Sequence, residues 1–174
     1  AHRPLSPTAL ELTLRRDGLA FQAGQLLTIH GPSLLDDRCY TIASGENDDE
    51  LRVLYRLVPG GRLTPQLAQL KPGDAAEISA PYGEFTLRDP ARPLVFVATG
   101  TGIAPCRAYL RTYPGLRLTV LHGVRTAADL FYREELAAGA DYHACVSGES
   151  VPGCFAGRVT ACARTLDFPP EAQF

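Results

Sequence analysis

The sequence predicts two domains, an antiparallel β-barrel or sandwich followed by an α/β domain with a parallel sheet. Two observations lead to this fold class. Short alternating or β-branched segments recur about every 10 to 15 residues through the first half. Beyond residue 93, apolar strands alternate with segments of helical length. The stretch Arg88–Pro93, with its two prolines, separates the two patterns. We therefore expect domains at residues 1–89 and 90–174.

The first half contains five candidate strands and one candidate helix. The strand segments are ALELTLRR, GQLLTIHG, RCYTIAS, LRVLYRLV and DAAEISAPYGEF. Turn residues separate them, as is typical of antiparallel barrels and sandwiches. In GRLTPQLAQL, Leu63, Leu67 and Leu70 share one helical face, and KPGD then ends the helix.

The second half alternates strands with helices. The strands are LVFVATG, LRLTVLHG and YHACVS, and the helices are GIAPCRAYLRTY, TAADLFYREELAAG and GRVTACARTL. Such alternation implies βαβ crossovers and a parallel sheet. Glu134 and Glu135, on the second of these helices, are expected to be solvated.

Composition excludes several classes of protein. A net charge of -2 provides no general basic field, so nucleic acid is not an expected partner. No apolar run reaches the roughly 20 residues of a membrane span, and no secretory signal is evident, so we expect a cytoplasmic protein. The five cysteines lack zinc or disulfide spacing and are expected to be free thiols, and no metal site is expected. The absence of methionine predicts that the chain is a fragment of a longer protein.

The segment LVFVATGTGIAP is the first candidate ligand site. Gly100 and Gly102 allow the backbone to approach a ligand, and Pro105 suits a first helical turn. A pyrophosphate above the strand end is one interpretation, and a tight turn without a ligand is the other. The third glycine of the dinucleotide fingerprint is replaced by Pro105, so this motif alone does not decide.

The segment RCYTIAS is the second candidate. On a strand, Arg38 and Tyr40 face one way, whereas Cys39 and Thr41 face the other. A guanidinium beside an aromatic ring suits a phosphate and a flat heterocycle, and the Thr41 hydroxyl lies next to them. A surface strand with an arginine lying over a tyrosine is the alternative.

These segments occur together with others in a characteristic order. The others are FQAGQLLTIHGP, GRLTPQLAQLKPGD, APYGEFTL, LHGVRTAADLFYREEL and GRVTACAR. In this order the chain resembles the ferredoxin–NADP reductase superfamily. The resemblance implies a six-stranded antiparallel Greek-key barrel that binds FAD, followed by an α/β domain that binds NAD(P). It also implies a further strand, helix and C-terminal segment that this chain lacks.

The resemblance assigns roles to the residues of the barrel. Arg38 would bind the flavin phosphates, Tyr40 would pack on the isoalloxazine, and Thr41 would hydrogen-bond near N5, so Tyr40 and Thr41 are the expected catalytic residues. Phosphate contacts from both Arg38 and the helix start favour FAD over FMN. Phe85 could equally be a core residue. The remaining flavin-binding residues implied are Arg56, Leu57, Val58, Gly61, Arg62, Leu63, Thr64, Gly83 and Phe85.

In the second domain, the resemblance assigns Gly100, Thr101, Gly102 and Pro105 to the nicotinamide coenzyme. Arg125 and Arg158 match positions that bind the 2'-phosphate of NADP. The segment VSGES, however, carries a glycine at 148 where NADP-dependent members have an arginine. We favour NADPH, with NADH as the alternative.

The expected function is an NAD(P)H-dependent flavoprotein oxidoreductase that exchanges electrons with a carrier such as ferredoxin or flavodoxin. One alternative is an NADH-dependent reductase component of an oxygenase, or a flavin reductase. Another is a flavin-binding electron-transfer or regulatory subunit that does not bind NAD(P)H productively.

Overall fold

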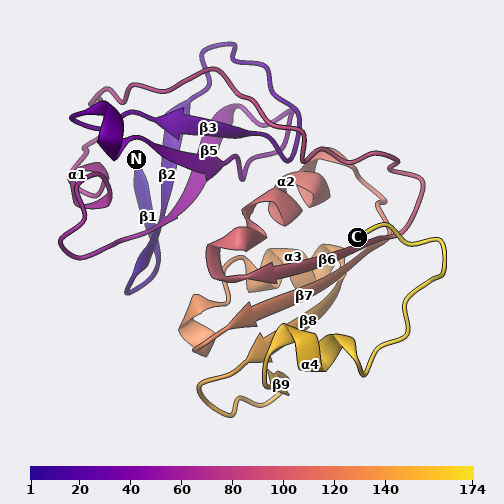
Figure 1. The fold of residues 1–174 in the computed structure, drawn as a ribbon. Helices are drawn as coiled ribbons and strands as arrows, with labels where there is room; N and C mark the ends of the chain where they lie inside the picture. Colours follow the sequence, from indigo (N-terminus) through magenta and orange to yellow (C-terminus); the bar gives the residue numbers. More distant parts are fainter.

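The computed structural model describes residues 1–174, which form two halves packed side by side (Figure 1). We call residues 1–89 the barrel domain and residues 90–174 the α/β domain, and this boundary stays a prediction. The barrel domain has β1 (His2–Ser6), β2 (Ala9–Arg15), β3 (Leu26–Ile29), β4 (Arg38–Thr41), β5 (Glu50–Arg56), η1 (Leu34–Asp36) and α1 (Thr64–Leu67). The α/β domain has β6 (Leu94–Thr99), η2 (Gly100–Ile103), α2 (Ala104–Thr112), β7 (Leu118–Val124), η3 (Ala127–Asp129), α3 (Arg133–Gly139), β8 (Asp141–Val146), β9 (Phe155–Ala156) and α4 (Val159–Ala163).

The strands of the barrel domain are all antiparallel, as predicted. They form a three-stranded sheet β1-β2-β5 and a two-stranded sheet β3-β4, which an Ile42–Val53 bridge joins. The expected sixth strand is reduced to isolated bridges from Ile78 and Tyr82 to β3. Pro81 lacks the N–H that a ladder needs, and this interrupts regular pairing in the segment.

The barrel core follows from alternation along the strands. Leu51, Val53 and Tyr55 of β5 point to one face and are at most 1% exposed. Leu63 and Leu67 pack against this face, as the helical pattern predicted. The helix is shorter than predicted because the amides of residues 69 and 70 bond three residues back, to Gln66 and Leu67, in tighter turns.

The α/β domain has one parallel sheet in the order β6-β7-β8-β9. Val95 and Leu121 pack against α4 on one face, while α2 and α3 cover the other. Next to β6, Gln173 forms an isolated parallel bridge with Leu94. The two-residue strand β9 was not predicted from the sequence. The longest helix, α2, has nine residues, and no helix is long and apolar enough to cross a membrane.

The predicted helix over TAADLFYREELAAG is divided in the structure. Tyr132 adopts a left-handed conformation with φ of 58°, so η3 ends before it and α3 starts after it. Glu135 of α3 was expected to be solvated, and this expectation was wrong. Its carboxylate lies 2.7 Å from Arg107 and 2.9 Å from Arg111. Burial opposes its ionisation, but these two hydrogen bonds outweigh burial and lower its pKa.

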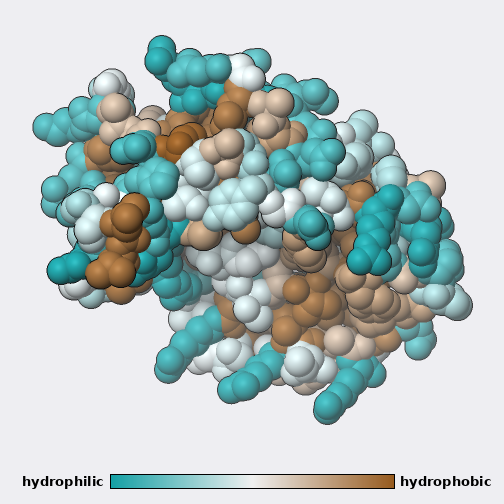
Figure 2. Space-filling model, turned by 45° about the horizontal axis from the view of Figure 1, so that its top comes forward, coloured by the Kyte–Doolittle hydropathy of each residue, from teal (hydrophilic) through white to brown (hydrophobic).

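The two domains share packed surface. The largest buried cluster has 18 residues and includes Ala9, Ala43 and Leu54 of the barrel domain together with residues of β6, α2 and α3. Apolar side chains also reach solvent, and Figure 2 shows brown areas over both domains. The exposed large apolar residues are Leu34, Leu35, Val58, Tyr82, Phe85, Val97 and Phe174.

Candidate functional site

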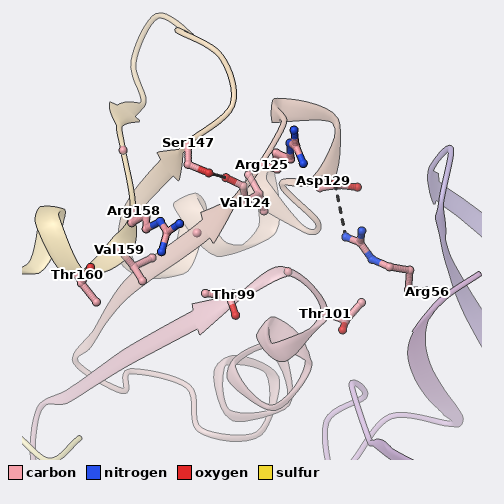
Figure 3. Close-up of a pocket in the computed structure, with 13 residues that line it drawn as sticks. Arg56, Thr99, Thr101, Val124, Arg125, Asp129, Ser147, Arg158, Val159 and Thr160 are labelled. Atoms are coloured by element: carbon pink, nitrogen blue, oxygen red, sulfur yellow. Dashed lines mark hydrogen bonds and ion pairs between the residues drawn. The ribbon is translucent and has the colours of Figure 1, made fainter. Parts of the chain in front are cut away.

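A cleft of about 660 Å³ opens where the strands of the parallel sheet end (Figure 3). The carboxyl ends of β6, β7 and β8 form its base, which is where open parallel sheets bind ligands. The barrel domain reaches the same cleft through Arg56 at the end of β5. The lining residues are Arg56, Thr99, Gly100, Thr101, Gly123, Val124, Arg125, Asp129, Ser147, Gly157, Arg158, Val159 and Thr160.

The loop after β6 contributes Gly100 and Thr101 to this cleft. Gly100 has φ of 52°, a left-handed conformation that favours glycine. Gly102 has no atom within 4 Å of where a Cβ would be, so its surroundings are open. Pro105 is buried in the first turn of α2. Of the four loop residues predicted to bind coenzyme, Gly100 and Thr101 therefore line the cleft, and Gly102 and Pro105 do not.

His122, which sequence reasoning left without a role, supports this loop. The imidazole is completely buried, with Nε2 at 3.1 Å from the Gly100 carbonyl and Nδ1 at 3.0 Å from the Tyr142 hydroxyl. Nε2–H donates to the carbonyl if Tyr142 donates to Nδ1. Burial lowers the pKa of His122 to about 4, so the ring is neutral near pH 7.

Gly123 forms the floor of the cleft. A Cβ at this position would lie 2.6 Å from Cγ1 of Val159, so a larger residue would fill the base of the cleft or displace α4. Gly123 was not among the predicted site residues. The sequence does place it at the end of a predicted strand, directly after His122, and this is the feature that could have identified it.

Three guanidinium groups face the cleft. Arg125 and Arg158 are exposed, and their side chains make no ion pair or hydrogen bond within the protein. Arg56 lies on the opposite side, where Nη2 is 3.5 Å from Oδ2 of Asp129 (Figure 3). This ion pair joins the barrel domain to the α/β domain across the cleft. Two unpaired arginines make the cleft suitable for an anionic ligand.

A steric restriction explains why position 148, in VSGES, is a glycine rather than an arginine. The Gly148 amide donates to the Arg125 carbonyl at 2.8 Å, and a Cβ at 148 would lie only 2.5 Å from the same oxygen. An arginine therefore cannot occupy position 148 without displacing the backbone of Arg125.

The RCYTIAS motif has the predicted alternation. Arg38 and Tyr40 pair with Ile29 and Leu27 of the barrel core, and Thr41 lies on the other face. Tyr40 makes an edge contact with Tyr55, with ring centroids 6.3 Å apart, and burial raises the pKa of Tyr40. Nη1 of Arg38 donates to the carbonyls of residues 35 and 37 at 3.0 and 2.7 Å.

Arg62 lies near the same loop as Arg38, with Nη1 3.4 Å from Oδ1 of Asp36. A hydrogen bond from Ser33 is the main cause of the lowered pKa of Asp36, and both arginines reinforce it against the effect of burial. The structure thus brings two of the predicted flavin-binding arginines, Arg38 and Arg62, to one corner of the barrel.

The residues from Arg56 to Thr64 form one compact turn. The Val58 amide donates to Oγ1 of Thr64 at 3.0 Å, and the Gly61 amide donates to the Val58 carbonyl at 2.9 Å. Val58 is 51% exposed, whereas Leu63 is buried in the barrel core. Leu57 is half-buried, and its amide donates to the Thr8 carbonyl. Leu63 therefore has a core role, while Val58 presents apolar surface.

Phe85 is a surface residue held by its backbone. Its side chain is 60% exposed, although the ring edge contacts Phe96. Its carbonyl accepts a hydrogen bond from Tyr109 of α2. Gly83, two residues earlier, has φ of 103° and allows the chain to turn there. The alternative of a core role for Phe85 is therefore wrong.

These residues fit the groups that the sequence implied. Exposed apolar side chains and two cations on the barrel suit a flat heterocycle that carries phosphates. The cleft, with a glycine floor and unpaired arginines, suits a second anionic nucleotide.

Comparisons with known proteins agree with this arrangement. Residues 6–87 match the oxidoreductase FAD-binding domain family, and residues 96–145 match the oxidoreductase NAD-binding domain family. The chain belongs to the ferredoxin–NADP reductase superfamily. It therefore has an FAD-binding and an NAD-binding domain in the order characteristic of this superfamily.

Curated members of the superfamily are similar over most of this chain. Ferredoxin–NADP reductase B of Sorangium cellulosum is 40% identical over 150 residues, which cover 79% of this chain and 61% of that protein. The phenol 2-monooxygenase reductase component of a Pseudomonas species is 37% identical over 145 residues, covering 77% of this chain and 41% of that protein. The chain thus spans less than two thirds of these relatives.

Solved structures of the superfamily have the same fold. The Amycolatopsis cytochrome P450 reductase GcoB superposes with a TM-score of 0.86 at 27% identity, over 99% of this chain and 58% of that one. A ferredoxin–NADP reductase from Neisseria gonorrhoeae, solved with bound FAD and NADP, has a TM-score of 0.81 at 19% identity, over 98% of this chain and 79% of that one. At that identity the second likeness concerns the fold alone.

Proposed function

We propose that the protein is an FAD-dependent oxidoreductase that transfers hydride between NAD(P)H and flavin and exchanges electrons with a small carrier such as ferredoxin or flavodoxin. The observation that carries this proposal is the cleft at the sheet ends, which is lined by the nucleotide loop on one side and by Arg56 of the barrel domain on the other. FAD, when bound, supplies an acceptor for two electrons that can release them singly.

The barrel residues would bind and orient the flavin. Arg38 and Arg62 would neutralise its phosphates, and the hydroxyl of Thr64, which accepts from the Val58 amide, would donate a hydrogen bond to them. The ring of Tyr40 would pack on the isoalloxazine, and Thr41 would donate a hydrogen bond near N5. Their support is the exposed cationic corner and the half-buried Tyr40 ring.

The cleft residues would orient the coenzyme, and NADPH is our preferred substrate. Arg125 and Arg158 have no protein partners, so a 2'-phosphate could pair with both. The glycine at 148 leaves two arginines where NADP-dependent members have a third, and NADH therefore remains the alternative. A charged hydrogen bond contributes about 1.5 to 3 kcal/mol, so each arginine is expected to favour NADPH about 10-fold or more.

A second candidate is the reductase component of an oxygenase. It is favoured by the 37% identity to the phenol 2-monooxygenase reductase component and the 33% identity to the electron transfer component of toluate 1,2-dioxygenase. A flavin-binding subunit without productive coenzyme binding is disfavoured by the open, arginine-lined cleft.

Because all five cysteines are free thiols, we also propose a cytoplasmic location.

The test is an anaerobic absorbance titration of the purified protein with each coenzyme. Bleaching of bound flavin by NADPH at much lower concentration than by NADH is expected. Arg125→Gln and Arg158→Gln should each raise the NADPH concentration required about 10-fold and leave NADH unaffected. Arg164→Gln, at an exposed arginine without partners, is the control. Preference for NADH would move the assignment to the second candidate, and a protein that cannot bind flavin would refute both.

A further inference from the structure

Arg107 is a charged side chain buried at the junction of the two domains. It lies on α2, the helix that continues directly from the nucleotide loop, and only 2% of its surface is exposed. A guanidinium removed from water to this extent is tolerated only with close, well-oriented partners. Its partners therefore show which parts of the molecule it connects.

The partners of Arg107 come from both domains. Nε is 2.7 Å from Oε2 of Glu135 in α3, and Nη1 donates to the carbonyl of Ala43 at 2.9 Å. Nη1 also lies 3.7 Å from Oε2 of Glu11 in β2, which is itself 2% exposed. The guanidinium lies over the ring of Tyr132, 4.5 Å from its centroid, and the Tyr132 hydroxyl donates to Glu11 at 2.9 Å.

The bond to Ala43 connects Arg107 to the flavin motif. Ala43 belongs to RCYTIAS and stands two residues after Thr41. Its amide donates to the Arg52 carbonyl at 2.7 Å, so its main chain is fixed to β5. Arg107 thus joins the backbone of the flavin motif directly to the helix whose first turn follows Gly100 and Thr101.

A second connection lies one helical turn further along α2. Nε and Nη2 of Arg111 donate to both carboxylate oxygens of Asp48, at 2.6 and 2.8 Å. Nη1 of Arg111 donates to Glu135 at 2.9 Å, so this carboxylate supports both arginines. Fork-shaped contacts of this kind restrict orientation as well as distance.

We propose that Arg107 is a positioning residue that sets the separation between the flavin site and the nicotinamide site, with Glu135 and Arg111 holding it in place. This role rests on the proposed hydride transfer. Reacting atoms must approach to about 3 to 3.5 Å, and a misplacement of about 1 Å can cost about 100-fold in rate. Arg107 is not among the residues that line the cleft. Removing its contacts between α2 and the barrel domain, which we call the joint, should therefore slow hydride transfer without weakening coenzyme binding.

The kinetic test compares Arg107→Met and Arg107→Lys with Arg164→Met. Methionine retains apolar bulk without charge, whereas lysine retains charge but lacks the fork that holds Ala43 and Glu135 together. In anaerobic stopped-flow reduction at saturating coenzyme, we expect Arg107→Met to be about 100-fold slower, Arg107→Lys intermediate and Arg164→Met unchanged. The Kd for coenzyme should stay within about twofold. An unchanged rate in Arg107→Met, or a weaker Kd at an unchanged rate, overturns the proposal. If Arg107→Met does not fold, Arg107→Lys and Glu135→Gln decide by the same criteria.

A geometric measurement keeps this test separate from the proposed function. Spin labels at Gln66→Cys in α1 and Ala161→Cys in α4, with Cys39→Ser and Cys154→Ser, report the distance between the domains. We expect a narrow distribution that broadens in Arg107→Met. An equal width in both proteins overturns the positioning role. If neither coenzyme reduces the flavin of the parent protein but the distribution still broadens, the proposed function fails while Arg107 is shown to hold the joint.

Discussion

Acidification should destabilise the protein through His122. This side chain is completely buried, and both ring nitrogens already have partners in Gly100 and Tyr142. Protonation would place a charge in the core with no carboxylate in hydrogen-bond contact. Burial lowers its pKa to about 4, from an ordinary value of 6.5.

The sign and size of the effect follow from these two values. Between pH 6.5 and pH 4 the unfolded chain binds a proton at His122 and the folded protein does not, so stability falls as pH falls. The whole contribution is about 3 kcal/mol, of which about 2 kcal/mol is lost between pH 7 and pH 5. It is fully present above pH 6.5.

The assay is urea unfolding of the parent protein and His122→Gln at pH 7 and pH 5. Glutamine can still donate to the Gly100 carbonyl but does not titrate. Asp36 and Asp37 have lowered pKa values and lose their contribution only as pH falls through the acidic range below about 4, outside this window. His2, whose pKa is also lowered, affects both proteins equally. A free energy of unfolding that falls by the same amount in both, within about 0.5 kcal/mol, would refute the reasoning.

Three further substitutions test the geometry. Gly148→Ala should raise the KM for NADPH several-fold in steady-state assays. The reason is that the alanine Cβ would lie 2.5 Å from the Arg125 carbonyl oxygen and displace that arginine. An unchanged KM would contradict this. Gly24→Ala should lower the free energy of unfolding by about 3 kcal/mol or more, because φ is 95° and the Cβ would lie 1.7 Å from the Phe85 carbonyl oxygen. Thermal unfolding measures this loss, and a decrease in Tm of less than about 2 °C would contradict it. Glu11→Gln should lower the free energy of unfolding by about 1 to 3 kcal/mol, because it removes the charge of a buried carboxylate 3.2 Å from Arg3 and 3.7 Å from Arg107, while Glu135 still pairs with Arg107. Exposed Glu134→Gln should cost almost nothing in the same urea titration, and equal costs in the two variants would contradict this.

Much of the fold could be predicted because its signals are local. The alternation of β5 and the apolar run of β6 identify strands by their own side chains. The left-handed Gly100 and the proline at the start of α2 mark the nucleotide loop. Boundaries were less predictable. The helix expected around Tyr132 is interrupted there because that residue is left-handed, and its hydroxyl reaches Glu11, 121 residues away.

The candidate site divides in the same way. Arg125 and Arg158 were identified from sequence, and both line the cleft. His122 and Asp129 were not, because a lone histidine in a strand and an aspartate in a turn carry no distinctive pattern. Their importance comes from partners on other elements, Gly100 and Arg56.

The sequence by itself determined the order of the two domains and the positions of most strands and helices, because these depend on residues that are neighbours in the chain. The two nucleotides were implied by the resemblance that the order of the motifs supports. Only the tertiary structure decided how the flavin motif and the nucleotide loop are joined. Arg107 is followed 28 residues later by Glu135 and contacts Ala43, 64 residues before it. No local pattern marks that arginine as buried, since its desolvation is compensated only when the folded chain brings these distant partners together.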